Sequence, residues 1–295
     1  MADFDHPYVY ERDEFHAIAR SSFPLAVYSV AGTAALTPLH SHKFYELVIV
    51  TGGDGIYRDE KQSYHIKAGD VLLLRPDIAH EYCRQNHLAV TNILWMEDEL
   101  KFQMYDLTSM PGWNSLFEIE PLMRPRNDFL PLNLEGRLLA EAERLVYHME
   151  SELKSGEPGA QLMAIGLFSQ LLVFLCRCYA NASTPRYQEL QSLDKVLLYM
   201  NKHFSERISR AQLAALVAKS ESSFYRSFCR IIGYTPSAYL TNIRLRNAEQ
   251  LLRNSALPVS EVALRCGFYD SSYFCTCFNK VYGMPPHRYR NRSNT

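Results

Sequence analysis

The chain has 295 residues, of which 47% are hydrophobic and 21% charged, and its net charge is −1. This length favours two domains, and the apolar fraction excludes a disordered, collagen-like or low-complexity protein. Seven cysteines without a Cys-x-x-Cys spacing, and an N-terminus without a signal-peptide layout, argue against a disulfide framework, a zinc finger and secretion. The most apolar stretch, 165–176, is shorter than the roughly 20 residues that span a bilayer, so we expect a cytoplasmic protein without a membrane partner.

Residues 46–95 contain short strand-like runs separated by glycine, aspartate and proline. The runs are 46–53, 56–59, 63–70, 71–74 and 90–95, with turns at 69–70 and 75–77. Closely spaced short strands are typical of a β-sandwich or a small β-barrel. We therefore predict an N-terminal β-domain over residues 1–130.

Polar side chains interrupt the start of this strand region. His40, His42 and Glu46 have a spacing at which extended backbone directs them to one face, and His80 follows a Gly69 and Pro76 pair farther along the chain. These residues resemble the two cupin motifs, in which the positions matching His40, His42, Glu46 and His80 hold a metal in cupin enzymes. The resemblance implies a cupin-like barrel.

Two helical segments follow the predicted barrel. Residues 134–153 carry apolar side chains at helical spacing, whereas residues 159–179 are apolar on nearly every side and must be buried against other helices. We assign residues 131–180 to appended helices, which form a dimer interface or pack only on their own barrel. The polar run 181–185 begins a predicted linker over residues 181–192.

Residues 209–290 contain the same helical unit twice. Each copy, 209–228 and 259–278, has a short amphipathic helix, a polar turn and a second helix. A single copy occurs in plain helical hairpins, but two in tandem with matching caps and stops predict a double helix-turn-helix domain over residues 193–295. The predicted caps and stops are Ser209 with Gln212, Ser220, Asp270, Gly233 and Gly283.

The segment that joins the two copies predicts how they reach DNA. Residues 236–253 read as one helix of about 27 Å, and successive major-groove segments on one DNA face lie about 34 Å apart. Residues 244–252, 259–263, 266–268 and 278–290 resemble the DNA-binding domain of the AraC-type transcription regulators. The resemblance implies a monomeric seven-helix module that binds double-stranded DNA, attached to a domain that senses a ligand or drives dimerisation.

The resemblance also implies which side chains face the DNA. The candidates are Ser222, Tyr225 and Arg226 on the first recognition helix, Ser271, Ser272, Tyr273 and Thr276 on the second, and Lys280 and Arg290. Arg226 can bond guanine with two N–H groups, and the hydroxyls serve bases or phosphates. The alternative is that these residues only solvate the helix faces.

The second recognition helix departs from the family pattern. Cys275, Thr276 and Cys277 are neutral where the family usually carries Arg or Lys, which puts strong contacts from this helix in doubt. The domain as a whole is nevertheless basic, because from Arg186 onward there are sixteen Lys and Arg against seven Asp and Glu. A basic half attached to an acidic half is expected of a phosphate-binding domain with a partner domain.

The whole chain therefore resembles an α+β two-domain regulator, with a cupin-like β-barrel and appended helices followed by an all-α tandem helix-turn-helix. We expect a transcription regulator, not an enzyme, controlled by a small sugar-like effector. It should work as a homodimer that contacts RNA polymerase, and the segments 44–50 and 88–95 are most similar to L-rhamnose regulators.

Three roles stay open for the four candidate barrel residues, His40, His42, Glu46 and His80. They line an effector pocket, as in AraC-type sensors that bind a sugar without a metal, or they hold a divalent metal, or they are structural. No cofactor is required for the first of these roles. The rival function is a metal-dependent cupin enzyme fused to a DNA-binding module.

Overall fold

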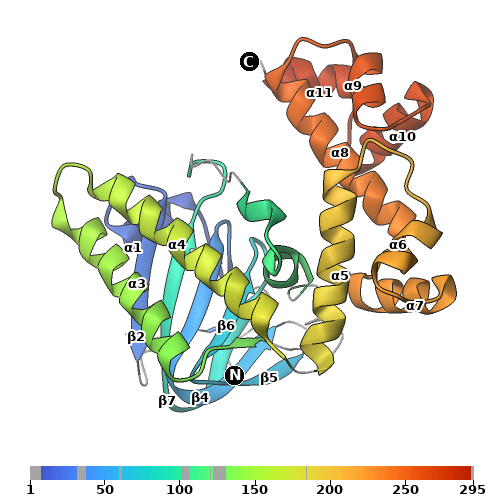
Figure 1. Ribbon diagram of the computed structural model, residues 1–295. Coiled ribbons are helices and arrows are strands. Elements are labelled where there is room, and N and C mark those ends of the chain that lie inside the picture. Colours follow the sequence, from blue (N-terminus) through green and yellow to red (C-terminus); the bar gives the residue numbers. More distant parts are fainter. Residues whose placement is uncertain are drawn as a thin grey trace, which may run out of the picture. The chain divides into compact units, whose positions relative to one another are not determined.

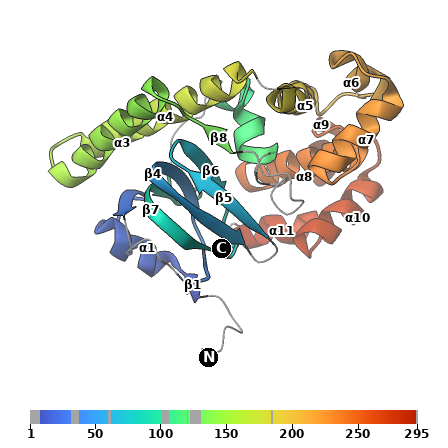
Figure 2. The ribbon, with the colours of Figure 1, turned by 90° about the horizontal axis from the view of Figure 1, so that it is seen from below.

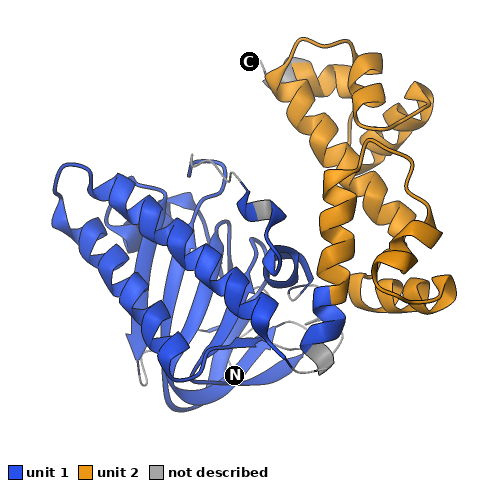
Figure 3. Ribbon diagram, in the orientation of Figure 1, with its two compact units in different colours: residues 1–191 blue, residues 192–295 orange. Residues whose placement is uncertain are grey.

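The computed structural model describes residues 8–31, 38–59, 62–100, 106–119, 121, 131–183 and 185–293 (Figure 1). The chain divides into two compact units, Met1–Gln191 and Ser192–Thr295 (Figure 3). Unit 1 combines a β-sheet with helices, and the described part of unit 2 contains only helices and their connections. The predicted α+β two-domain fold is confirmed.

Unit 1 is built on one strongly curled sheet of eight strands within the described residues (Figure 2). The order along the sheet is β1-β3-β7-β4-β6-β8, with β2 also paired to β7 and β5 to β4. The strands are β1 (Tyr8–Tyr10), β2 (Leu25–Ala31), β3 (His40–His42), β4 (Tyr45–Asp59), β5 (Ser63–Lys67), β6 (Asp70–Leu74), β7 (His80–Trp95) and β8 (Leu132–Asn133).

The long strand β4 differs from the sequence expectation. The predicted runs 46–53 and 56–59 belong to this one strand, whose pairing with β7 shifts register between Val50 and Ile56. Gly53 lies at this irregularity with φ +64°, and a Cβ there would overlap the backbone carbonyl of His87. The glycines therefore mark a bulge inside a strand, where the sequence pattern predicts an interruption.

Helices cover part of the curled sheet. They are α1 (Arg12–Ala19), the short segments η2 (Leu107–Ser109) and η3 (Ser115–Ile119), α3 (Arg137–Ser155) and α4 (Ala160–Asn181). The helices α3 and α4 pack side by side along one side of the sheet (Figures 1 and 2). By length and composition α4 could cross a bilayer, but Phe168, Leu172 and Cys176 are buried inside the unit, as in a core helix.

The helix α5 (Pro185–Lys202) occupies most of the segment 181–192 that the sequence predicts as a linker. Proline at the start of α5 is compatible with a helix, because the first turn needs no N–H donor from it. The amide of Gln191 donates to the carbonyls of Tyr179, Ala180 and Ala182, at 3.1, 3.1 and 2.8 Å. These bonds cap the end of α4, so the described part of the predicted linker is ordered by polar contacts.

Unit 2 contains two helix-turn-helix pairs joined by a long helix. The elements are α6 (Arg210–Leu216), α7 (Glu221–Ile232), α8 (Pro236–Asn254), α9 (Val259–Arg265), α10 (Ser271–Tyr282) and α11 (Pro286–Ser293). The two recognition helices bury equivalent pairs of phenylalanines, Phe224 with Phe228 and Phe274 with Phe278. These aromatic side chains pack each recognition helix against α8 or against the other helix of its helix-turn-helix pair.

Local capping defines the ends of these helices as the sequence predicts. Ser209 and Gln212 form a reciprocal capping box, and the side chains of Ser220 and Asp270 accept hydrogen bonds from the first turns of α7 and α10. Gly233 and Gly283 end α7 and α10 in the left-handed conformation.

Candidate functional site

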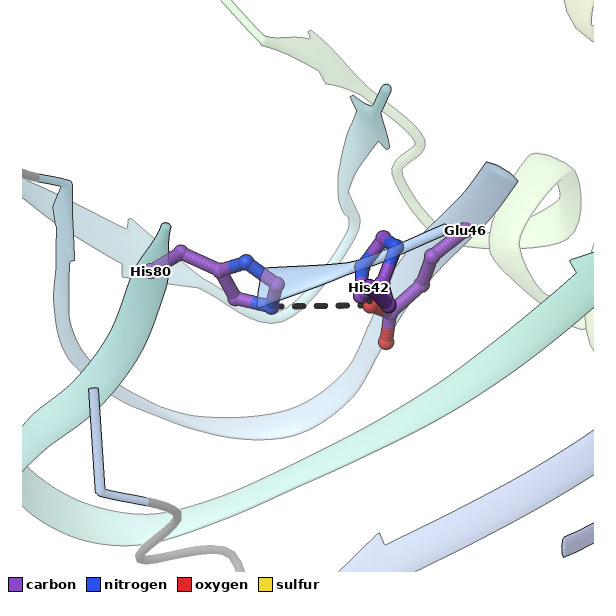
Figure 4. Close-up of side chains that lie close together, drawn as sticks. All are labelled: His42, Glu46 and His80. Carbon is purple, nitrogen blue, oxygen red and sulfur yellow. Dashed lines mark hydrogen bonds and ion pairs between the residues drawn. The ribbon is translucent and has the colours of Figure 1, made fainter. Parts of the chain in front are cut away.

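The four polar residues predicted from the sequence lie together and are buried in unit 1. His40 and His42 come from β3, Glu46 from β4 and His80 from β7, where His80 is the register partner of His40. The Nε2 atoms of His42 and His80 lie 2.9 and 3.5 Å from the same oxygen of Glu46. Figure 4 shows the ring of His80 directed at this carboxylate. The His40 and His80 rings are 4.3 Å apart between centroids.

The backbone fixes how each imidazole ring is turned. The Nδ1 atoms of His40, His42 and His80 lie 2.9, 2.6 and 3.0 Å from the carbonyl oxygens of residues 38, 44 and 78. A carbonyl accepts only, so each Nδ1 carries the proton and donates it. The Nε2 atoms then face the interior of the cluster. A ring that carries both protons donates from Nε2 to the Glu46 carboxylate, whereas an Nε2 without a proton can accept a hydrogen bond from a ligand or bind a cation.

The electrostatics of the cluster favour a charged carboxylate beside a neutral imidazole. Burial acts to raise the pKa of Glu46, but the 2.9 Å hydrogen bond with His42 and the charge interaction with the nearby His80 ring outweigh it and hold that pKa well below its usual range. Burial, with the neighbouring His80, lowers the pKa of His40 to about 4. At neutral pH the cluster therefore presents a carboxylate and an uncharged His40 ring.

Three of the four residues can meet at one point. One ligand atom each from His42, Glu46 and His80 lies within 4.8 Å of the others, and all three residues are buried. Two imidazole nitrogens and one carboxylate oxygen are a donor set that suits divalent transition metals. The described residues thus fit either a metal or a hydroxyl-bearing ligand at this point.

The cluster lies in the wall of a cavity of about 760 Å³ in unit 1. The strands β2, β3, β4 and β7 and the end of α1 line it, with apolar side chains such as Phe44 and Leu94 beside the polar cluster. Asn92 lines this cavity too, and its amide oxygen is buried and has no hydrogen-bond partner among the described residues. A cavity of this size with a few convergent polar groups is typical of a small-molecule site.

Several lining residues were missed by the sequence analysis. Tyr82 and Asn92 lie on β7 with His80 and line the same cavity, but residues 80–89 were not recognised as a strand, so Tyr82 and the continuity from His80 to Asn92 were missed. Glu150 and Lys154 of α3 also line the cavity and form a 2.6 Å ion pair. No local sequence signal marks them, because only the packing of α3 beside β2 brings them to the cavity.

The predicted DNA-facing residues lie on the surface of unit 2. Arg226 of α7 and Tyr273 and Lys280 of α10 are exposed, as are Ser222, Ser271, Ser272 and Thr276, while Tyr225 is half-buried. Some of the candidates also make contacts within the protein. The Thr276 hydroxyl donates to the carbonyl of Ser272 at 3.0 Å, and the half-buried Arg290 donates to the carbonyl of Leu257 at 2.6 Å.

Comparisons with known proteins agree with both units. The model of the AraC-like ligand binding domain matches residues 23–172, and that of a helix-turn-helix domain matches residues 213–292. The chain is 30% identical over 255 residues to the HTH-type transcriptional activator RhaR of Enterobacter sp. (strain 638), covering 86% of this chain and 87% of that protein. It is 29% identical over 262 residues, with the same coverage, to RhaR of Mannheimia succiniciproducens.

The chain is also similar to a solved structure. The DNA-binding domain of AdpA, a global transcriptional factor crystallised with a target DNA, is 32% identical, with a TM-score of 0.33 over 34% of this chain and 91% of that one. The curated relatives are transcription activators and not enzymes, which supports the regulator and not the cupin enzyme. The chain belongs to the AraC family of DNA-binding transcription regulators that carry an AraC-like ligand binding domain.

Proposed function

We propose that the regulator is controlled by a small polar metabolite, of the size and chemistry of a sugar, that binds in the cavity of unit 1. The observation that carries this proposal is the cavity of about 760 Å³ with His40, His42, Glu46 and His80 in its wall. A carboxylate and unprotonated ring nitrogens accept hydrogen bonds from hydroxyl groups, and the apolar side chains nearby suit the C–H faces of a sugar ring.

The position of the cavity also links effector binding to the helices of unit 1. Glu150 and Lys154 of α3 form part of its wall, so a bound molecule contacts the helical pair as well as the sheet. An effector that binds more tightly to one arrangement of α3 and α4 shifts the population toward that arrangement, by no more than its differential affinity. This coupling makes DNA binding or activation responsive to the metabolite.

Binding measurements with paired variants test the effector site. L-Rhamnose is the first probe, because segments 44–50 and 88–95 resemble L-rhamnose regulators, and other neutral monosaccharides follow. The chain should bind one of these sugars by calorimetry, and His42→Gln with Glu46→Gln, which nearly preserves side-chain volume, should weaken binding at least tenfold. His65→Gln is the matched control, because His65 is exposed and outside the cavity. Unchanged affinity in the double variant would refute the proposal.

A bound divalent metal is the second candidate for this cluster. It is favoured by the convergence of His42, Glu46 and His80 and by the Nδ1 bonds that turn Nε2 inward. Such an ion would supply a positive charge that orients effector hydroxyls. Elemental analysis of the purified regulator decides: near one metal per chain in the wild type and far less in His80→Gln supports this candidate, and metal-free protein that still binds effector excludes it.

We further propose that the regulator is a cytoplasmic homodimer that activates transcription through RNA polymerase at its promoter. Support for the dimer comes from the apolar side chains on the outer surface of the helical pair, with Leu162 74% and Tyr147 68% exposed. Leu162→Glu should produce monomers in sedimentation experiments, whereas Gln161→Glu on the same helix should leave the mass unchanged. Identical masses for both variants and the wild type would remove α4 from the interface.

We propose that α7 and α10 are the helices that read DNA, each entering the major groove. The proposed contacts are the exposed polar residues and the half-buried Tyr225 on these helices: Ser222, Tyr225, Arg226, Ser271, Ser272, Tyr273, Thr276 and Lys280. Arg290 is a weaker candidate for a DNA contact, because part of its guanidinium group already donates a hydrogen bond to the carbonyl of Leu257. Footprinting on the cognate site with alanine variants tests each residue.

A further inference from the structure

A groove that the sequence motifs do not identify lies between the two helix-turn-helix pairs of unit 2. Its volume is about 740 Å³, and its wall includes Tyr225 of α7, Tyr273 of α10 and the N-terminal part of α8. It therefore opens between the two helices proposed to read DNA. Its lining contains Arg207, Arg210 and Arg244, and no carboxylate among the described residues.

Two of these arginines are each held beside a tyrosine. The guanidinium carbon of Arg207 lies 4.8 Å from the ring centroid of Tyr269, and that of Arg210 lies 5.2 Å from the centroid of Tyr225. These distances are in the range of cation–π contacts, which restrain the side chain and leave its N–H groups available to an anion. Both arginines are exposed, so a ligand can reach them.

The partners of the two arginines do not neutralise the groove. Arg210 has one acidic neighbour, Glu221, at 3.6 Å, and both side chains are more than half exposed. A solvent-exposed pair at this distance is weak and can open when a stronger anion arrives.

Arg244 has a different function in the same groove. Its Nε and one terminal nitrogen donate to the carbonyls of Phe204 and Glu206, at 2.7 and 2.8 Å. Arg244 is partly buried and its donors serve the backbone just before Arg207. It therefore positions the loop that presents Arg207, and we expect it to act through that loop.

We propose that Arg207 and Arg210 bind the phosphate backbone of the DNA segment that lies between the two major-groove sites. A phosphodiester is the ligand that fits, because the groove offers cationic N–H donors flanked by tyrosine and serine hydroxyls and no carboxylate among the described residues. This inference rests on α7 and α10 being the reading helices. The arrangement also supplies a phosphate contact beside the second helix-turn-helix, whose Cys275, Thr276 and Cys277 are neutral, because Arg207 lies against Tyr269 at its turn.

The test compares charge-removing variants of the full chain on DNA over a range of salt concentrations. Removing one arginine that binds a phosphate should reduce the slope of log K against log salt by about 0.9, which corresponds to roughly fivefold in affinity near 0.15 M salt. Arg207→Gln and Arg210→Gln should each show this reduction, with the same factor on cognate and base-substituted sites. Arg265→Gln is the matched control, because it removes one charge from an exposed arginine outside the groove.

A chemically modified DNA locates the contact. Neutral methylphosphonate linkages between the two major-groove sites should weaken binding of the wild type, but should have little further effect on the Arg207→Gln, Arg210→Gln double variant. Equal slopes for the double variant and the wild type, or equal losses from Arg265→Gln, would overturn the inference. Arg226→Ala, measured in parallel, separates the two hypotheses. If Arg226→Ala weakens binding in a sequence-dependent way while the double variant keeps the wild-type salt slope, the proposal that α7 and α10 read the DNA stands and only the proposed phosphate contacts of Arg207 and Arg210 are rejected.

Discussion

The ring of Trp95 at the end of β7 packs against Phe168 of α4, with their centroids 5.2 Å apart. Trp95 also stacks on Tyr45, its register partner on β4. Tyr45 directly precedes Glu46 of the buried cluster. Aromatic contacts thus join the strand that carries the proposed effector site to the helix that offers the proposed dimer surface.

Phe168→Ala should strongly destabilise unit 1, because Phe168 is fully buried and a truncated phenylalanine leaves a cavity under Trp95. The expected loss in the free energy of unfolding is about 3–5 kcal/mol. Urea denaturation monitored by tryptophan fluorescence measures it. Gln161→Ala on the exposed face of the same helix should change stability by less than about 0.5 kcal/mol. Similar losses from the two variants would mean that α4 is not oriented with Phe168 inward.

Gly267→Ala should destabilise unit 2 more than Gly283→Ala does. Both glycines have positive φ, +79° and +72°, so alanine is strained at each. At Gly267 a Cβ would also come within 2.8 Å of the carbonyl oxygen of Ser205, whereas nothing lies within 4 Å at Gly283. We expect about 1 kcal/mol at Gly283 and at least about 2 at Gly267, from thermal unfolding of each variant. Equal decreases in the unfolding temperature of the two variants would show that the backbone at Ser205 moves away freely.

The sequence predicted unit 2 in detail, because its helix ends depend on local chemistry. The capping box of Ser209 and the left-handed stops at Gly233 and Gly283 are formed by residues a few positions apart, so their pattern is visible in the chain itself. The grouping of His42 with Glu46 was found for a related reason, since strand alternation fixes which side chains share a face, whereas His80 was added through the resemblance to the cupin motifs.

Other features depend on contacts that spacing does not encode. β4 continues through Gly53 because a bulge admits the extra residues, and only pairing with β7 reveals it. Glu150 reaches the cavity through the packing of α3, and Arg207 reaches the groove through a loop held by Arg244. These positions carry no periodic pattern, and their roles follow only from the tertiary structure.

Residues 186–295 should bind DNA as an isolated fragment with strong salt dependence. The fragment holds an excess of nine positive charges, since sixteen Lys and Arg oppose seven Asp and Glu. If five to seven phosphates are contacted, the slope of log K against log salt should be roughly −4.5 to −6. Fluorescence anisotropy from about 50 to 300 mM salt measures this slope. The Debye length is about 10 Å at 0.1 M, within this range. A slope near zero would contradict a charge-driven mode of binding.

The two reading helices should contribute unequally to sequence discrimination. Arg226 of α7 is an exposed two-pronged donor, and a bidentate contact to guanine discriminates by about 1–3 kcal/mol. Arg226→Ala should therefore weaken specific binding by roughly 5- to 150-fold and relax the preference at one or two base pairs. The Thr276 hydroxyl of α10 already donates to Ser272, so Thr276→Ala should cost less than about 1 kcal/mol.

The measurement for this last pair is a set of binding curves for each variant on the cognate site and on base-substituted sites. A fold check by circular dichroism is needed, because Phe228 packs in the core two positions from Arg226 and a local cavity would also weaken DNA binding. An Arg226→Ala loss of the same size on every sequence would assign this side chain to the phosphates. Equal losses from the two variants would instead give α10 the same weight as α7, even though its central residues are neutral.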